Sequence, residues 1–223
     1  MASSNSRELS DQAVLDALRR FDLVPTATQI TTIRRYVSVL LQWNQNMNLT
    51  GLSDPLEIVS RHFGESWFAT KLVDLRSGRL ADIGSGAGFP GLALKICQIE
   101  LSVTLVEQNK KKAAFLSEVS NTLGLGGTSV VPQSYEDWNV PAETLDFLTA
   151  RAIGQYPRLL KWSLMALKPR GKLILWLGED ESNYIQTKPG WSWGIPARVP
   201  GSVRRQILVG SPDFPKVRDF LLR

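Results

Sequence analysis

The residues whose types and spacing suggest chemistry lie in the stretch LADIGSGAGFPGL, residues 80–92. A short apolar run there meets three glycines at alternate positions: Gly84, Gly86 and Gly88. Glycine tolerates positive φ and has no side chain, so such a loop can bend sharply and bring its backbone close to a ligand. Pro90 then suits the first turn of a helix, where a missing N–H costs nothing. Strand, glycine turn and helix together predict the nucleotide-binding corner of an open α/β sheet.

The glycine spacing alone does not identify the cofactor, because Gly86-x-Gly88-x-x-Gly91 also matches the dinucleotide pattern. Two acids discriminate better. Asp82, at the strand end, is expected to face the ligand, where it would repel a pyrophosphate but attract the sulfonium and ammonium groups of S-adenosylmethionine. Glu107 ends the next apolar run, where an acid can accept hydrogen bonds from ribose hydroxyls. Together the two acids favour a methyl donor; the other interpretation is a tight turn with two solvated acids.

Length and composition limit the classes of protein. A chain of 223 residues is long enough for one large domain with an appendage. The net charge of +5 leans weakly towards a polyanionic partner. Cys97 is the single cysteine, so no internal disulfide can form and the chain suits a reducing compartment. Residues 1–9 lack the apolar core of a signal peptide, and no apolar run is long enough for a membrane span, so we expect a cytoplasmic protein.

Hydrophobic periodicity divides the chain into two parts. Residues 10–75 have helical spacing, and we expect Ser10, Thr28 and Asp54 to cap three successive helices. From Leu80 onward strands and helices alternate, which predicts an α/β fold with a parallel sheet and helices on both faces. The expected later strands are 103–106, 128–131, 145–150, 172–177 and 203–209. The prolines of residues 188–202 predict a loop between the last two strands.

Four segments resemble one protein family in its own order and spacing: residues 43–67, 80–96, 111–119 and 151–173. This is the bacterial glucose-inhibited division protein B family, which methylates guanine N7 in small-subunit ribosomal RNA. The Asn-x-Asn-Leu-Thr run that ends at Thr50 and the Arg151-Ala152 pair carry the resemblance more specifically than the glycine corner does. The resemblance implies a Rossmann-like class I methyltransferase domain over residues 78–223, with residues 1–77 as a helical cap packed on it. It also implies S-adenosyl-L-methionine as donor and 16S ribosomal RNA as acceptor.

The resemblance implies cofactor contacts at Gly84 and Phe89 and at Glu107, with Tyr135 and Glu136 beside the adenine. Adding the rest of the glycine corner gives the full cofactor-binding set: Asp82, Gly84, Ser85, Gly86, Gly88, Phe89, Glu107, Tyr135, Glu136 and Arg151. Arg151 is the family arginine at the mouth of the pocket. It could bind the cofactor carboxylate, an RNA phosphate, or an internal acid such as Glu65, and we favour a role in the pocket because strand ends line such sites.

Four residues are candidates for RNA binding: Arg61, His62, Lys110 and Lys111. Each has a second interpretation. Arg61 could equally form a structural ion pair, and for His62 a single structural hydrogen bond is the simpler interpretation. The lysines begin a predicted helix capped by Asn109, where a charge run is usually solvated but where cations oppose the helix dipole. Arg34-Arg35 and Arg204-Arg205 are expected to be solvated.

The chain contains no obvious acid–base pair, and guanine N7 needs none because its lone pair is free at neutral pH. Exocyclic-amine methyltransferases carry an Asn/Asp-Pro-Pro-aromatic turn where this chain has residues 150–154, ARAIG. Cys97 lies among apolar helix residues, which favours packing over a nucleophilic role, and one histidine and one cysteine cannot form a metal site. Two other functions stay open: a small-molecule methyltransferase and a non-catalytic, cofactor-binding RNA-interaction protein. The second is supported by Gly178-Glu179, since the family usually has a lysine after strand five. We expect a monomer.

Overall fold

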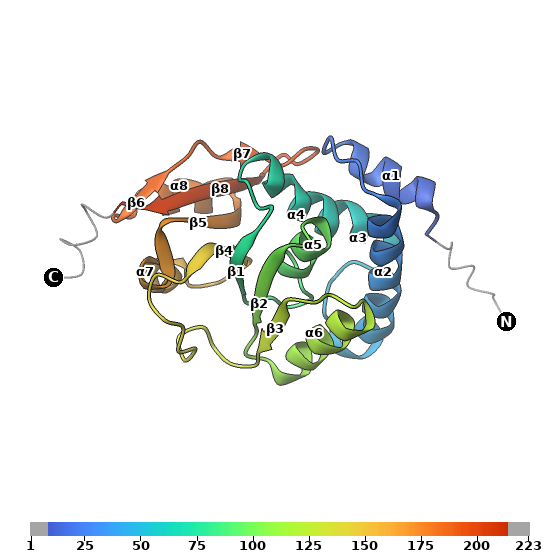
Figure 1. Ribbon diagram of the computed structural model, residues 1–223. Helices are drawn as coiled ribbons and strands as arrows, with labels where there is room; N and C mark the ends of the chain where they lie inside the picture. Colours follow the sequence, from blue (N-terminus) through green and yellow to red (C-terminus); the bar gives the residue numbers. More distant parts are fainter. Residues whose placement is uncertain (1–8, 214–223) are drawn as a thin grey trace.

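A single sheet runs through the part of the chain that the computed structural model describes, residues 9–213 (Figure 1). Its strands are β1 (Gly78–Ile83), β2 (Leu101–Val106), β3 (Thr128–Val131), β4 (Leu145–Arg151), β5 (Leu167–Gly178), β6 (Trp191–Trp193), β7 (Ala197–Arg198) and β8 (Arg205–Pro212). Their order across the sheet is β3-β2-β1-β4-β5-β8-β6, with β7 beside β8. Strands β1 to β5 are parallel, and β8 runs antiparallel to β5. The predicted α/β fold is thereby confirmed.

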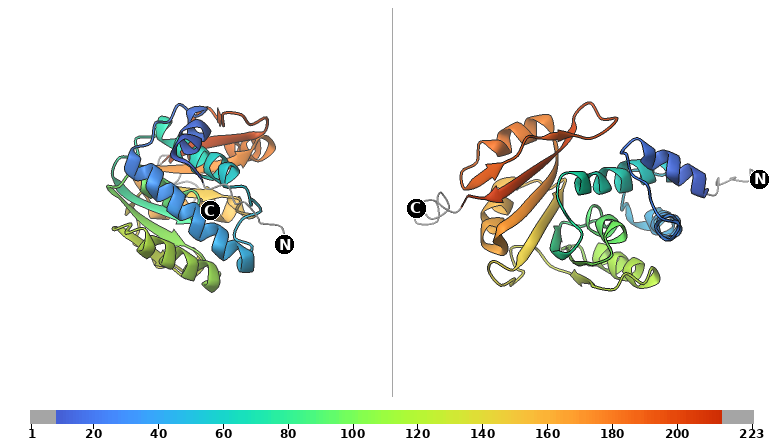
Figure 2. Two further views of the ribbon diagram at one scale, coloured as in Figure 1. Left: turned by 90° about the vertical axis from the view of Figure 1, so that its right-hand side faces the viewer. Right: turned by 45° about the horizontal axis from the view of Figure 1, so that its top comes forward.

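Helices cover both faces of this sheet, as the two turned views in Figure 2 also show. They are α1 (Asp11–Arg19), α2 (Ala27–Met47), α3 (Pro55–Ile58), α4 (Glu65–Trp67), α5 (Gly91–Cys97), α6 (Lys110–Thr122), α7 (Tyr156–Ala166) and α8 (Glu179–Gln186). A π-helical turn, η1 (Val59–Gly64), and a 3₁₀ turn, η2 (Phe68–Lys71), flank α4. One hydrophobic cluster joins α2, α5 and α6 to the sheet, and a second joins α7 and α8 to its other face. Apolar helix faces on both sides explain why the strands are almost entirely buried.

Side-chain caps explain most of the helix starts. Ser10 accepts from the N–H of Ala13, and Asp54 accepts from the N–H of Glu57, as the sequence predicts. The cap of α2 is Thr26 and not Thr28. A capping box needs a glutamate or glutamine three residues on, which Thr26 finds in Gln29. The third helical segment ends at Lys71, four residues before the expected Leu75.

The N-terminal helices pack directly on the glycine corner. The hydroxyl of Tyr36 in α2 donates to the carbonyl of Ala87 at 2.5 Å, and the indole N–H of Trp67 in α4 donates to the carbonyl of Ala93 at 2.6 Å. Tyr36 also meets Phe63 and Phe89 at ring-centroid distances of 5.3 Å. These buried contacts tie the helices of residues 11–71 to the loop that follows β1, so they influence the shape of that loop.

The C-terminal part of the sheet differs from expectation. The predicted loop of residues 188–202 contains β6 and β7, which both pair with β8. Trp191 and Trp193 stack on each other at 5.1 Å, and the edge of β8 that does not face β5 supplies backbone partners that proline spacing does not reveal. Arg205, expected to be solvated, forms an ion pair with the buried Glu65. Within residues 9–213 no helix combines the length and apolarity that a bilayer crossing requires.

Candidate active site

The order of the strands places a crevice beside β1. The chain leaves β1 towards β2 on one side, whereas β4 lies on the other side, and ligands of open α/β sheets bind at such a reversal, outside the carboxyl ends of the strands. A cavity of about 450 Å³ lies there. Its walls come from the ends of β1, β2 and β4, the turn after β3 and the start of α7.

The glycine loop and Glu107 form one wall of this cavity. Gly84 and Gly86 have φ angles of +67° and +54°, a region that side chains disfavour, and the Gly84 N–H donates to the carbonyl of Val106 at 2.8 Å. One carboxylate oxygen of Glu107 accepts from the N–H of Gly86 at 2.9 Å, and the other accepts from the N–H of Asn109 at 2.8 Å. Glu107 and Gly84 both line the cavity. Two backbone donors therefore hold the predicted acid in place, and each oxygen keeps a lone pair for a ligand hydroxyl.

Asp82 does not face the cavity, contrary to the prediction. Its side chain is completely buried, and its carboxylate accepts from the N–H of Gly91 at 3.1 Å and from the hydroxyl of Thr149 at 2.7 Å. Burial raises the pKa of this carboxyl to about 6, although hydrogen bonds from Thr149 and Gly91 oppose the shift. The acid joins the start of α5 to β1 and β4. The carboxylate therefore stabilises the sheet and the start of α5. Because Asp82 does not face the cavity, its charge no longer distinguishes a methyl donor from a pyrophosphate.

Three more residues of the predicted cofactor set are packing residues. Ser85 is buried and donates to the backbone carbonyl of Asp82, and Phe89 lies within the aromatic cluster around Tyr36. A side chain at Gly88, whose φ is +84°, would collide with the hydroxyl of Tyr36. None of these three lines the cavity. Gly88 and Phe89 pack against Tyr36 of the N-terminal helices, whereas Ser85 bonds within the loop itself.

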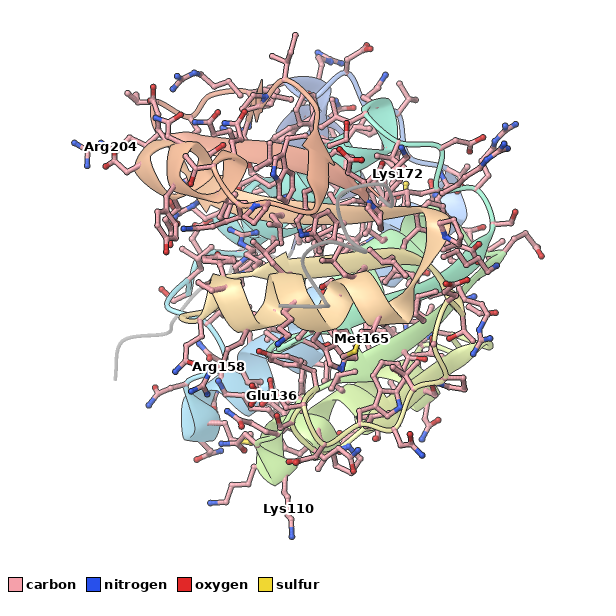
Figure 3. All side chains as sticks on the ribbon, turned by 90° about the vertical axis from the view of Figure 1, so that its left-hand side faces the viewer. Lys110, Glu136, Arg158, Met165, Lys172 and Arg204 are labelled. Atoms are coloured by element: carbon pink, nitrogen blue, oxygen red, sulfur yellow. The ribbon has the colours of Figure 1, made fainter. Side chains whose placement is uncertain are left out.

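Tyr135 and Glu136 line the cavity from the turn after β3. Tyr135 packs edge-on against Trp162 of α7 at 5.4 Å, and Glu136 lies 3.9 Å from a guanidinium nitrogen of Arg158. Figure 3 shows Glu136 and Arg158 side by side near the start of α7, with Lys110 beyond them at the start of α6. An aromatic ring and two opposite charges thus form the outer wall, opposite the glycine loop.

Arg151 reaches an internal acid. Its guanidinium donates to Glu65 at 3.1 Å and to the carbonyl of Arg61 at 3.2 Å, and it does not line the cavity. The residues directly after it do. Ala152 has a φ of +57° and, with the following residues through Gln155, forms the wall on the β4 side. Of the three alternatives open for Arg151, the structure shows the internal acid.

Of the RNA candidates, His62 is the one whose ring makes a stacking contact and a side-chain hydrogen bond. Its Nε2 lies 2.8 Å from the hydroxyl of Thr50, and its ring stacks on Phe89 at 4.5 Å. Burial, with the nearby Arg151 and Arg61, lowers its pKa to about 3, so the ring is neutral at physiological pH. Arg61 is partly exposed and lies 4.0 Å from Glu57. Lys110 and Lys111 are exposed at the start of α6, where Asn109 caps the helix as predicted.

A family model and named relatives match most of this chain. Residues 29–191 match the family model described as rRNA small subunit methyltransferase G. The chain belongs to this family. A ribosomal RNA small subunit methyltransferase G of Xanthomonas euvesicatoria is 39% identical over 170 residues, which cover 75% of this chain and 79% of that protein. A protein of the same name from Lactococcus lactis is 36% identical over 166 residues, which cover 72% and 69% of the two chains.

Solved structures agree on the fold. A SAM-dependent methyltransferase from Aquifex aeolicus superposes with a TM-score of 0.57 at 18% identity, over 66% of this chain and 88% of that chain. A ribosomal protein L11 methylase from Lactobacillus delbrueckii superposes with a TM-score of 0.54 at 14% identity, over 69% and 79%. Fold and family membership confirm the predicted Rossmann-like class I methyltransferase, its S-adenosylmethionine cofactor and ribosomal RNA as the class of substrate.

For this family member, the sequence prediction missed part of the cavity wall. The missed residues follow strand ends or start the neighbouring helices: Gln108, Lys112, Gln133, Ser134, Ile153, Gly154, Gln155 and Arg158. The signal that could have found most of them is position, since residues just after parallel strands meet at one edge of the sheet.

Cys97, the single cysteine, lies apart from the cavity. Burial raises the pKa of its thiol to about 12. Within residues 9–213, no group of three or more His, Cys, Asp or Glu side chains is arranged to hold a metal ion.

Proposed function

We propose that this chain transfers a methyl group from S-adenosylmethionine to N7 of a guanine in small-subunit ribosomal RNA, as a cytoplasmic monomer. The observation that carries the proposal is Glu107, buried and fixed by two backbone N–H groups, on the wall of a cavity at the reversal of the strand order. In a class I methyltransferase, an acid in this position can accept hydrogen bonds from both hydroxyls of a ribose.

The residues present suit S-adenosylmethionine. Glu107 would hold the ribose, Tyr135 and Ile153 offer apolar surface for the adenine, and the glycine loop leaves room for close approach. Gly154 adds space, because a Cβ at this position would meet nothing within 4 Å. When bound, the cofactor supplies an electrophilic methyl group on a sulfonium ion. The protein holds the donor and the base in line and keeps bulk water out of the crevice.

Guanine N7 suits what the cavity contains. Its lone pair attacks without losing a proton, so no general base has to lie within hydrogen-bond reach. The cavity holds two carboxylates, and both are engaged: Glu107 with backbone N–H groups and Glu136 with Arg158. The wall on the β4 side, residues 152–155, has Gln155 as its one side-chain amide, and the Asn/Asp-Pro-Pro-aromatic turn of amine methyltransferases is absent from residues 150–154. These observations favour N7 over amine or carbon methylation.

The rim of the cavity is suited to an RNA chain. Lys112 and Arg158 line it, and Lys110 and Lys111 extend the basic surface outward from α6. Arg61 lies outside the cavity, in the segment that we assign to the helical cap, and its backbone carbonyl accepts from Arg151. Phosphate contacts by such side chains release counterions, so RNA affinity should fall steeply as salt rises.

The decisive experiment uses the full chain, radiolabelled donor and small-subunit RNA or subunits that lack the modification. We expect label in RNA as N7-methylguanine, which is recognised because its glycosidic bond and ring become labile to reduction and base. Label on another base or another atom would refute the N7 assignment. Label in small molecules only would instead support the small-molecule alternative, and donor binding without transfer would support the non-catalytic one.

A paired substitution tests the cofactor site. Gly86→Asp places a carboxylate beside Glu107, and aspartate tolerates the left-handed conformation of this position better than most residues do. We expect donor binding by calorimetry to be lost while the far-UV spectrum is unchanged. Gly126→Asp is the control, because a Cβ at Gly126 meets nothing within 4 Å and the residue does not line the cavity. Unchanged donor affinity in Gly86→Asp would place the site elsewhere.

A further inference from the structure

A buried carboxylate outside the cavity connects three parts of the molecule. Glu65 is 1% exposed and begins α4, directly after the π-helical turn η1. One oxygen of its carboxylate lies 3.1 Å from Arg151 and the other lies 2.8 Å from Arg205. Its backbone carbonyl accepts from the indole N–H of Trp176 at 2.9 Å. A single residue of the N-terminal helical segment therefore touches β4, β5 and β8.

The three partners lie at one edge of the sheet. Arg151 ends β4 and pairs in register with Trp176 of β5, while Arg205 begins the antiparallel β8 opposite Gly178. All three thus stand at the carboxyl end of the parallel strands, the edge that carries the cavity. The N-terminal segment contributes no residue to the cavity wall, yet through Glu65 it is fixed to the strand end next to that wall.

The backbone just after Arg151 is in an uncommon conformation. Ala152 has a φ of +57°. For any residue with a side chain this conformation is unfavourable, and it persists only when the surrounding structure holds it. The segment that this turn aims, residues 152–155, forms the wall of the cavity on the β4 side. Arg151 is held on both sides, by Glu65 and by the carbonyl of Arg61. The anchor and the strained turn are consecutive residues.

We propose that Glu65 is a positioning residue for methyl transfer: it fixes Arg151, and thereby the Ala152–Gln155 segment, in the form that binds the donor. This inference rests on the proposed cofactor site. A structural role alone would require only that the positive charges of Arg151 and Arg205 be balanced, whereas the positioning role requires the carboxylate itself opposite Arg151.

Two variants separate these roles. Glu65→Gln keeps the size of the side chain but leaves two arginines without a counter-charge, and we expect the dissociation constant of the donor to rise at least tenfold, with a lower melting temperature. Glu65→Gln combined with Arg205→Gln removes one positive charge together with the negative one. We expect the double variant to regain stability but to keep the weakened donor binding, because Arg151 still lacks its carboxylate.

Asp146 supplies a matched control at the other end of the same strand. It pairs with Lys168 at 2.6 Å and accepts from the N–H of Arg79 at 2.9 Å, at the amino end of β4, away from the cavity. Asp146→Asn should lower the melting temperature and leave donor affinity within twofold of the wild type. Hydrogen exchange should be faster at residues 152–155 in both Glu65 variants and unchanged there in Asp146→Asn.

Calorimetry with S-adenosylmethionine and its demethylated product, hydrogen exchange and steady-state kinetics give the readouts. The KM for the donor should rise in both Glu65 variants, with the KM for RNA unchanged. Wild-type donor affinity in either Glu65 variant, or unchanged exchange at residues 152–155, would overturn the positioning role. If the wild type binds donor and Gly86→Asp does not, such a result refutes this inference alone; a wild type without donor affinity refutes the proposed function.

Discussion

Asp82 on β1 and Glu107 after β2 are two acids at the ends of neighbouring strands. They look alike in the sequence but make different contacts in the structure. Asp82 is wholly buried between the start of α5 and Thr149, and its oxygens are used by protein donors. Glu107 also accepts two backbone N–H bonds, yet it lines the cavity. The difference shows that an acid after a buried strand indicates which edge of the sheet carries the cavity. It does not show whether the side chain of that acid points into the cavity.

The largest expected effect is on stability, from Asp82→Ala. The change leaves the N–H of Gly91 buried without an acceptor and leaves the hydroxyl of Thr149 only the carbonyl of Ala81, at 3.5 Å; each buried group that loses its acceptor costs about 1–3 kcal/mol. We expect the free energy of unfolding to fall by about 3–4 kcal/mol in denaturant titrations. Donor affinity should change less than Glu107 variants change it. Strong loss of affinity with full stability would reverse the roles assigned to the two acids.

The pH dependence of the unfolding free energy, compared between the wild type and Asp82→Ala, sharpens the contrast. The pKa of Asp82 is about 6 in the folded protein, because burial outweighs its hydrogen bonds, against 3.8 in the unfolded chain. Between these values the folded protein holds a proton that the unfolded chain has lost, so this group stabilises the fold more as pH falls. The difference in unfolding free energy between the wild type and Asp82→Ala should therefore grow by about 2 kcal/mol from pH 7 to pH 4. A constant difference would mean that Asp82 does not titrate in this range.

Glu107→Gln should affect donor binding more than the fold. The amide keeps the volume and one acceptor but loses the charge, and a hydrogen bond to a charged group contributes about 1.5–3 kcal/mol. We expect donor affinity by calorimetry to fall about tenfold or more, and the melting temperature to fall less than in Asp82→Ala, because only one backbone N–H, of Gly86 or Asn109, loses its acceptor. Equal donor affinity in the two proteins would show that the ribose, or the donor itself, lies elsewhere.

The smallest effect is expected from Cys97→Ser. The thiol lies on α5 away from the cavity, and burial raises its pKa to about 12, so it supplies no thiolate nucleophile. The initial rate of RNA methylation should stay within twofold of the wild-type rate under identical conditions. A loss of activity without a loss of folded protein would argue for carbon methylation through a covalent cysteine adduct.

Local chemistry explains where the sequence prediction succeeded. Strand 128–131, the cap of α6 at Asn109 and the glycine corner depend on neighbours in the chain, and the structure has them where expected. The errors follow from partners distant in sequence. Arg205 was expected in solvent but meets Glu65, 140 positions earlier, and Asp82 was expected to face the ligand but meets Thr149, 67 positions later. No spacing rule connects residues that far apart.

The sequence by itself determined the fold class, the family and the edge of the sheet that carries the cavity, because glycine spacing, strand periodicity and helix caps are properties of short segments. Only the tertiary structure decided which side chains face the cavity. Packing of α2 and α5 turned Asp82, Ser85 and Phe89 inward, and the meeting of β4, β8 and the N-terminal helices brought Arg151 to Glu65. The direction of a side chain depends on which distant elements pack beside it, and neighbouring residues in the sequence do not determine that packing.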